Sequence, residues 1–353
     1  MWIIGCDFHP CYQQIAGLDK ASGEVIERRL SHEGKEAAAF YESLPRGALV
    51  GMEATCAARW FERLLDRCGH QLWVGDSAQI RALAVRKQKT DARDARHLLQ
   101  LLMTEQFPRI WIPAPAERDV RQLLVHRHKL VQWRTQVQNQ LHALARNEGV
   151  RPHTSFWTHK GRQQLESMPL DRWAARRRQD LLRMLDELDP QIAELTWQVE
   201  QEAQRRPEAI ELMTQPGVGP LVSLAFVLTL GIARRFPRGK QVASYLGLNP
   251  AEYSSGDRQR LGHISKQGNQ MLRWLLVEAA WMAARKDPEL ERMFKRLAFR
   301  RGRKIAVVAV ARKLAVKLYW RLRRIEEARK AQPAPMQGRS GSGLVNAASS
   351  PTA

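Results

Sequence analysis

Short apolar runs separated by turn residues dominate the first hundred residues of the chain. Five of them have the length and composition of β-strands: 1–8 (MWIIGCDF), 13–19 (QQIAGLD), 24–30 (EVIERRL), 47–54 (GALVGMEA) and 70–76 (HQLWVGD). Gly23 suits a hairpin turn, residues 56–69 are typical of a helix, and the pattern is helical again beyond Thr90. Strands followed by helices predict an α/β domain over residues 1–112, with helices on the faces of a sheet.

A helical periodicity begins near Pro113. The first apolar repeat, with a step of seven, consists of Leu123, Leu130, Val137 and Leu144. The second, with steps of three and four, consists of Leu181, Leu185, Leu188, Ile192, Leu195 and Val199. These repeats predict an arm of two coiled-coil-forming helices over residues 113–205, with a break at Gly149 and Pro152 and a kink or restart at Pro190. Two arrangements fit the pattern: a helical hairpin within one chain, or an arm through which chains dimerise.

The remainder of the chain, residues 206–330, is expected to be mostly helical. Residues 212–231 (LMTQPGVGPLVSLAFVLTLG) have the form of a helix-hairpin-helix, 251–269 of a loop and 270–284 of a helix, and a very basic helical region closes the unit. The tail, residues 331–353, is rich in Pro, Gly, Ser and Ala and is expected to be disordered. The predicted fold class is therefore α/β plus α.

The charge of the chain narrows the class of its partners. A formal net charge of +21 favours a polyanion, with nucleic acid first, because lysines and arginines displace counterions from phosphates. With 44% hydrophobic residues over 353 positions, the chain can build real cores, so it is not simply a basic tail. We find no signal peptide and no apolar stretch of membrane-spanning length, which predicts a cytoplasmic protein without a membrane partner. The four cysteines lack the spacing of a zinc site or a disulfide framework.

Four acidic residues are the first candidates for chemistry. Asp7 and Glu53 lie near the ends of two predicted strands, and Asp91 and Asp94 begin a predicted helix. If these carboxylates converge they repel one another, unless divalent cations such as two Mg²⁺ ions neutralise them and align water or a hydroxyl against a phosphate. The competing interpretation needs no metal: Thr90 is an N-cap and Asp91 a favourable acid in the first turn.

Two further segments could contact or cleave nucleic acid. In PGVGP the glycines would let backbone amides approach a phosphate, although half of such turns simply join helices. The candidate nucleic-acid-binding residues are Gly217, Gly219, Lys240, Arg258, Arg260 and Lys266. In YSSGDRQRLGHISKQGN a serine hydroxyl could attack a phosphodiester if a base or metal removed its proton while the cations stabilised the charge. A serine beside a glycine is otherwise an ordinary turn.

Several of these motifs occur together, in the order of a known family. GCDFH, GMEA, KTDARDA, LMTQPGVGPLVS, YLGLNPAEYSSGDRQRLGHISKQGNQMLRWLLVEAA and GRKIAVVAVARKLAVKLYW resemble the insertion-sequence transposases of the IS-one-ten type, also called DEDD transposases, over roughly residues 1–325. The resemblance implies an RNase-H-type, RuvC-like domain, a coiled-coil arm and a C-terminal transposase domain carrying a serine nucleophile. The segment GIARRF lacks an acid that the family often has there. This difference concerns packing or backbone contact and leaves the implied chemistry unchanged.

The resemblance also assigns roles to residues. Asp7, Glu53, Asp91 and Asp94 match the four metal-binding acids, and Ser255 matches the nucleophile better than Ser254. It implies a structured noncoding guide RNA that pairs with double-stranded donor and target DNA, and a homo-oligomer, a dimer or tetramer, in which the acids of one protomer serve the serine of another. The resulting hypothesis is a transposase acting as an RNA-guided DNA recombinase with Mg²⁺.

Two other hypotheses compete with this one. In a metal-dependent Holliday-junction resolvase, water is the nucleophile and Ser255 is a turn residue. A non-enzymatic nucleic-acid scaffold would carry a degenerate acid cluster, which all four acids at matching positions disfavour. A covalent protein–DNA adduct distinguishes the recombinase from the resolvase, and function without magnesium would favour the scaffold.

Overall fold

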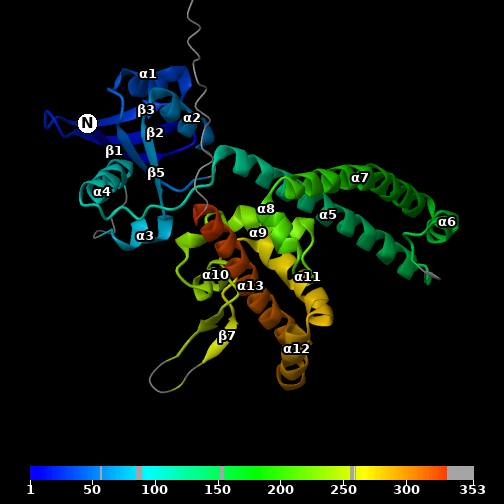
Figure 1. The fold of residues 1–353 in the computed structure, drawn as a ribbon. Helices are drawn as coiled ribbons and strands as arrows, with labels where there is room; N and C mark the ends of the chain where they lie inside the picture. The colour runs from blue at the N-terminus through cyan, green and yellow to red at the C-terminus, as the bar shows by residue number, and fades with distance from the viewer. Residues whose placement is uncertain (56–57, 85–89, 152–154, 255–257, 259, 332–353) are drawn as a thin grey trace, which may run out of the picture. The chain divides into compact units, whose positions relative to one another are not determined.

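The computed structural model describes residues 1–55, 58–84, 90–151, 155–254, 258 and 260–331 (Figure 1). The chain forms two compact units, Met1–Ile112 and Pro113–Ala353. Three predictions lie outside the described residues: the helix break at Pro152, the nucleophile Ser255 and the disordered tail from residue 332 onward.

A five-stranded sheet forms the centre of the N-terminal unit. Its strands are β1 (Trp2–Phe8), β2 (Tyr12–Asp19), β3 (Val25–Ser31), β4 (Leu49–Glu53) and β5 (Gln71–Gly75), so all five predicted strands are confirmed. The strand order is β3-β2-β1-β4-β5; β1 pairs antiparallel with β2 and parallel with β4, and β4 is parallel to β5. The parallel strands β1 and β4 therefore end at the same edge of the sheet.

Helices cover both faces of this sheet, as predicted. They are η1 (Glu33–Lys35), α1 (Glu36–Ser43), α2 (Arg59–Cys68), α3 (Ser77–Ala82) and α4 (Asp91–Met103). Ile4 and Cys6 of β1 belong to the core with α1 and α2, whereas Ile3 packs with Leu98 and Leu102 of α4 on the other face. The period-2 alternation of a strand accounts for this division. Sequence analysis missed α1 and α3 because both are too short to show a clear helical period.

Gly5 allows α4 to approach β1 with no side chain between them. A Cβ on Gly5 would lie 2.2 Å from the carbonyl oxygen of Ala95 and 2.4 Å from the backbone nitrogen of Leu99. Its register partner Gly51 would place a Cβ 2.7 Å from the tip of Leu102, a side chain that can move. Of these two glycines, only Gly5 faces backbone atoms of α4, which a Cβ could not displace.

We expect Gly5→Ala to lower the unfolding free energy by about 3 kcal/mol, because overpacking against backbone cannot be relieved by a rotamer change. Gly51→Ala is the matched control on the neighbouring strand and should cost clearly less. Urea unfolding of both variants measures the difference. Equal losses would show that α4 is not held against β1 as closely as described.

The arm of the C-terminal unit is a helical hairpin. It consists of α5 (Pro115–Asn147), α6 (His159–Ser167) and α7 (Arg172–Gln204), with α5 and α7 side by side (Figure 1). Val137 and Leu144 of α5 are buried with Leu181 and Leu185 of α7, so pairing within one chain already buries the predicted repeats. The structure thus has the intrachain arrangement, and dimerisation through the arm stays a prediction.

One of the two alternatives predicted at Pro190 is wrong. Helix α7 does not restart at Pro190 but runs through it, because this proline is exposed and the carbonyl that loses its hydrogen bond can be solvated. The predicted break is confirmed at Gly149, since α5 ends at Asn147; the short helix α6, which was not predicted, precedes α7, and Thr158 caps it by accepting a hydrogen bond from the amide of Gly161.

A helical body completes the C-terminal unit. Its helices are α8 (Pro207–Met213), α9 (Pro220–Leu230), η2 (Ala233–Arg235), α10 (Gly239–Tyr245), α11 (Gln270–Lys286), α12 (Pro288–Arg301) and α13 (Arg303–Ala331). Leu124 of α5 and Val199 of α7 are buried in the same core as α9, α11 and α13, so the base of the arm is part of the body. Across the described parts of the chain, no helix is both long and apolar enough to cross a bilayer.

The segment 251–269, expected to be a loop, contains a β-hairpin. Strands β6 (Pro250–Glu252) and β7 (Leu261–Ile264) pair antiparallel and project from the helices (Figure 1). The prediction was wrong because the strands are three and four residues long and mostly exposed, so they show no alternation of buried and polar positions.

Candidate active site

The fold places Asp7 beneath the N-terminus of α4. Asp7 lies near the end of β1, two positions after Gly5, so both residues face α4. Asp91 is the first residue of α4, one helical turn before Ala95, which contacts Gly5. The close approach at Gly5 therefore brings the start of α4 to the end of β1.

Capping and clustering of acids coexist at the start of α4. The hydroxyl of Thr90 accepts a hydrogen bond of 3.4 Å from the amide of Arg93, and Asp91 and Asp94 lie in the first helical turn. The capping prediction is thus confirmed at Thr90. It does not exclude a catalytic role for the acids, because the cap uses the hydroxyl of Thr90 and leaves the carboxylate of Asp91 pointing to other partners.

Asp7, His9 and Asp91 form a compact cluster of possible metal ligands. One ligand atom from each lies within 4.8 Å of the other two. His9 Nε2 is 3.0 Å from Asp7 Oδ2 and 3.7 Å from Asp91 Oδ2. The hydroxyl of Tyr12 donates a 2.7 Å hydrogen bond to Asp91 Oδ2, and the rings of Tyr12 and His9 stack at 4.6 Å. Two strands and one helix thus fix this group.

The electrostatics of the cluster favour a cation. Burial raises the pKa of Asp7, and the negative charges of Asp94 and Asp91 raise it further, while His9 opposes the shift. The hydrogen bond to Asp91 raises the pKa of Tyr12, because the neutral hydroxyl is the form that can donate. Asp7 therefore pays an electrostatic cost when it ionises, and a bound cation would remove that cost.

Glu53 and Asp94 lie at the margin of the cluster. Met52 pairs with Cys6, so Glu53 at the end of β4 stands level with Asp7 on the neighbouring strand, and it is half-buried. Asp94 acts on the pKa of Asp7 and so lies near it. Among the described residues, neither has a carboxylate oxygen within the 4.8 Å group. The structure thus brings two of the four predicted acids into direct proximity.

Sequence analysis missed His9 and Tyr12. The signal for His9 is its position two residues after Asp7, which puts both on one face of an extended chain. Tyr12 is brought beside His9 by the tight turn between β1 and β2. A hydrogen bond from the amide of His9 to the carbonyl of Tyr12 closes this turn. The guanidinium of Arg29 on β3 covers the Tyr12 ring at 3.8 Å and helps to hold it.

The donor set fits a divalent cation. Two carboxylates and an imidazole suit several divalent metals, whereas Mg²⁺ prefers an all-oxygen set completed by water. Asp7 and Asp91 supply the oxygens, and His9 can also act as a second-layer partner, since it already contacts both carboxylates.

The two glycines of the predicted phosphate-binding turn face different surroundings. Gly217 has a φ of +85°, and a Cβ there would lie 2.6 Å from the carbonyl of Ala279 in α11, so its task is close packing between helices. Gly219 precedes Pro220 at the start of α9, and a Cβ there would meet no atom within 4 Å. Of the two, Gly219 has the open surroundings that a phosphate contact needs.

The other candidate residues of the C-terminal unit lie on exposed segments. Lys240 is exposed in α10, Arg258 and Arg260 are exposed between β6 and β7, and Lys266 is exposed just after β7. Ser254, the alternative nucleophile, donates a 2.6 Å hydrogen bond to Glu252 and accepts one of 3.1 Å from the amide of Arg260. Its hydroxyl therefore closes the end of the hairpin.

Comparison with known proteins gives the family. Residues 4–147 match the DEDD transposases of the IS110 type, and residues 209–295 match the family described as transposase IS116/IS110/IS902. A Pseudomonas aeruginosa protein named "Probable family 20 transposase" is 28% identical over 90% of this chain and 96% of its own length. The Coxiella burnetii "Transposase for insertion sequence element IS1111A" is 26% identical over 89% of this chain and 87% of its own length.

Taken together, the two matches and these relatives make the chain a transposase of the IS110 type. It is accordingly a transposase, an enzyme that cleaves and transfers DNA strands. Both matched segments contain candidate residues: the first includes Asp7, His9 and Asp91, and the second includes the PGVGP turn and the β6–β7 hairpin. Among the described residues of this transposase, the Asp7 cluster has a geometry that suits the divalent metal that a DEDD domain implies.

Proposed function

We propose that this transposase is an RNA-guided DNA recombinase that excises and inserts its own element. The observation that carries the proposal is the convergence of Asp7, His9 and Asp91 on one point of an α/β domain. We assign the domain a RuvC-like role, with Asp7, Glu53, Asp91 and Asp94 as the ligands of Mg²⁺. When bound, the metal would supply Lewis-acid stabilisation of the phosphate undergoing cleavage.

The residues of the cluster would prepare this site in distinct ways. Asp7 and Asp91 provide the central oxygens, and the hydrogen bond from Tyr12 fixes one oxygen of Asp91. His9 lies between the two carboxylates and holds them at a fixed separation. Glu53, at the end of β4, and Asp94, in the first turn of α4, would complete the ligand set.

The proposed nucleophile is Ser255. Its hydroxyl oxygen would form a bond to a DNA phosphorus as the bond from phosphorus to one sugar oxygen breaks, and the serine proton would end on that leaving oxygen. The amide of Gly219 and the cations Lys240, Arg258, Arg260 and Lys266 would hold the DNA backbone. In this assignment the turn before α9 acts as a helix-hairpin-helix phosphate contact.

We further propose that the active assembly is a dimer or tetramer joined through a coiled-coil contact of the arm, with a structured guide RNA that selects the DNA. The net charge of +21 supports a second polyanion besides DNA, since one chain offers many more cations than a single duplex contact needs.

The test is a reconstituted recombination assay with purified protein, donor DNA, target DNA and an RNA transcribed from the element's ends. We expect product only when both the RNA and Mg²⁺ are present, and a scrambled RNA of equal length is the control. Product without RNA would contradict RNA guidance, and product in excess EDTA would contradict the metal site. Cleavage with Mg²⁺ but without a covalent intermediate would favour the resolvase.

A further inference from the structure

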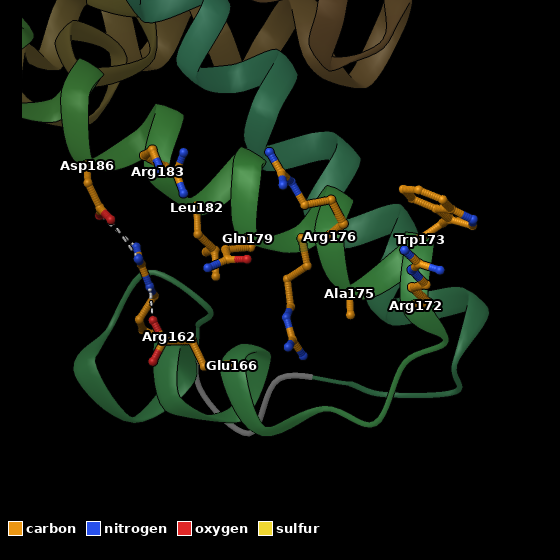
Figure 2. Close-up of a pocket in the computed structure, with 11 residues that line it drawn as sticks. Arg162, Glu166, Arg172, Trp173, Ala175, Arg176, Gln179, Leu182, Arg183 and Asp186 are labelled. Carbon is orange, nitrogen blue, oxygen red and sulfur yellow. Dashed lines mark hydrogen bonds and ion pairs between the residues drawn. The ribbon is translucent and has the colours of Figure 1, made fainter.

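A groove of about 810 Å³ lies between α6 and α7 at the tip of the arm (Figure 2). Its charged lining consists of Arg162, Arg172, Arg176, Arg178 and Arg183 against Glu166 and Asp186. Five arginines opposite two carboxylates leave the groove with a surplus of three positive charges. This groove lies on the arm, outside the Asp7 cluster and the β6–β7 hairpin.

Two of the arginines build the groove. Arg162 of α6 donates two hydrogen bonds of 2.8 Å to the carboxylate of Asp186 on α7 and one of 2.6 Å to Glu166 (Figure 2). Arg178 donates to the backbone carbonyls of Leu165 and Met168, at 3.0 and 2.6 Å. These contacts fix α6 and the segment after it to α7, so the cavity has rigid walls.

The other three arginines are available to a ligand. Arg172, Arg176 and Arg183 are all exposed on α7. They are four and seven residues apart, close to one and two helical turns, so they lie on the same face of the helix. Arg176 forms an exposed ion pair with Asp180, a type of contact that contributes little and is readily exchanged. Within the described residues Arg183 has no hydrogen bond or ion pair. The row spans about 16 Å of helix, enough to follow a phosphate backbone.

Trp173 adds a stacking surface beside this row. Its side chain is 73% exposed, it lies at the opposite end of the groove from Asp186 (Figure 2), and the guanidinium of Arg172 stands 4.9 Å from its ring centroid. Exposed aromatic rings next to arginines are the surface on which unpaired bases stack.

We propose that this groove binds unpaired nucleotides of RNA, with Arg172, Arg176 and Arg183 on the phosphates and a base stacked on Trp173. The choice of RNA rests on the proposed function, in which the guide RNA carries unpaired segments of its own, whereas the DNA partners enter as duplexes whose bases stay stacked until the RNA pairs with them.

The test uses the full chain and fluorescein-labelled probes, measured by anisotropy from low to high salt: a 20-nucleotide poly(U) RNA and a 20-base-pair DNA duplex. Trp173→Ala should weaken RNA binding about fivefold or more and leave duplex binding unchanged. The triple variant Arg172→Gln, Arg176→Gln, Arg183→Gln should lower the slope of log affinity against log salt by about 2 for RNA.

Two control variants distinguish a specific RNA-binding site in the groove from a general effect of substitution on the protein. Trp197→Ala removes a tryptophan that is 54% exposed on the same helix outside the groove, and it should bind RNA as the wild type does. The triple lysine variant at 172, 176 and 183 keeps the charges and should keep the slope. RNA affinity unchanged in Trp173→Ala, or an equal loss for RNA and duplex DNA, would overturn the proposal. Because these are binding measurements, they stand even if recombination proves independent of RNA.

Discussion

Asp7→Asn is expected to lower DNA strand cleavage more than a hundredfold while raising the melting temperature of the metal-free protein at pH 7. The loss of activity follows because a neutral amide cannot hold a divalent cation that contributes several kcal/mol to transition-state stabilisation. The gain in stability follows from the environment of Asp7, where burial and two neighbouring carboxylates oppose ionisation.

The sign of the stability effect comes from proton linkage. The pKa of Asp7 is raised above its ordinary value of 3.8, so the folded chain holds this proton more tightly than the unfolded chain does. The unfolding free energy therefore falls as the pH rises from about 3.8 through the folded-state pKa, and the ionised carboxylate is a cost at pH 7. Asparagine removes the charge and with it the cost. Mg²⁺ should raise the melting temperature of the wild type and leave that of Asp7→Asn unchanged.

Asp19→Asn is a matched control, for which the expected change in melting temperature has the opposite sign. The amino terminus, 2.7 Å away, and the amide of Ala21 lower the pKa of Asp19 to about 2. Its ionised form stabilises the fold above pH 3.8, and this contribution is lost as the pH falls toward 2. Asp19→Asn should therefore lower the melting temperature at pH 7 and keep the response to Mg²⁺. If Asp7→Asn instead melts lower than the wild type without metal, Asp7 is mainly a structural partner of His9.

The sequence was sufficient to predict the layers of the N-terminal unit but only part of its site. Alternation along MWIIGCDF identifies the strand and places Asp7 near its end. It cannot say that Gly5 lets the backbone of α4 approach so closely, and that contact is what sets Asp91 against Asp7. His9 lies in the turn after β1, so it is recognised as a neighbour of Asp7 only if the alternation of the strand is continued beyond Phe8. Side-chain proximity across elements distant in sequence needs the packing, which no local pattern contains.

The repeats of the arm show a different limit. A heptad at Leu130, Val137 and Leu144 states that one helical face is buried, and it does not state whether the partner helix belongs to the same chain. The structure supplies α7 of the same chain as that partner. The β6–β7 hairpin was missed for the opposite reason, since its exposed strands have no buried face to produce a pattern.

Ser255→Ala is expected to abolish strand cleavage entirely, because alanine has no oxygen to form the bond to phosphorus. Ser255→Cys should retain a trace of covalent product, since a thiolate is still a nucleophile. A denaturing gel of labelled DNA after reaction measures both, with a protein-linked band for the wild type that is missing in Ser255→Ala. Ser255 itself lies outside the described residues, so the structural argument for the register comes from its neighbour.

Ser254 provides that argument and the control. Its hydroxyl is engaged by Glu252 at 2.6 Å and by the amide of Arg260 at 3.1 Å, so an attack on DNA would require both contacts to break. Ser254→Ala should loosen the hairpin, slow the reaction about tenfold or less, and leave the adduct band visible, since a lost hydrogen bond contributes about 1 kcal/mol. An adduct that persists in Ser255→Ala and vanishes in Ser254→Ala would assign the nucleophile to Ser254. A wild type that cleaves with Mg²⁺ and forms no adduct would assign the attack to water.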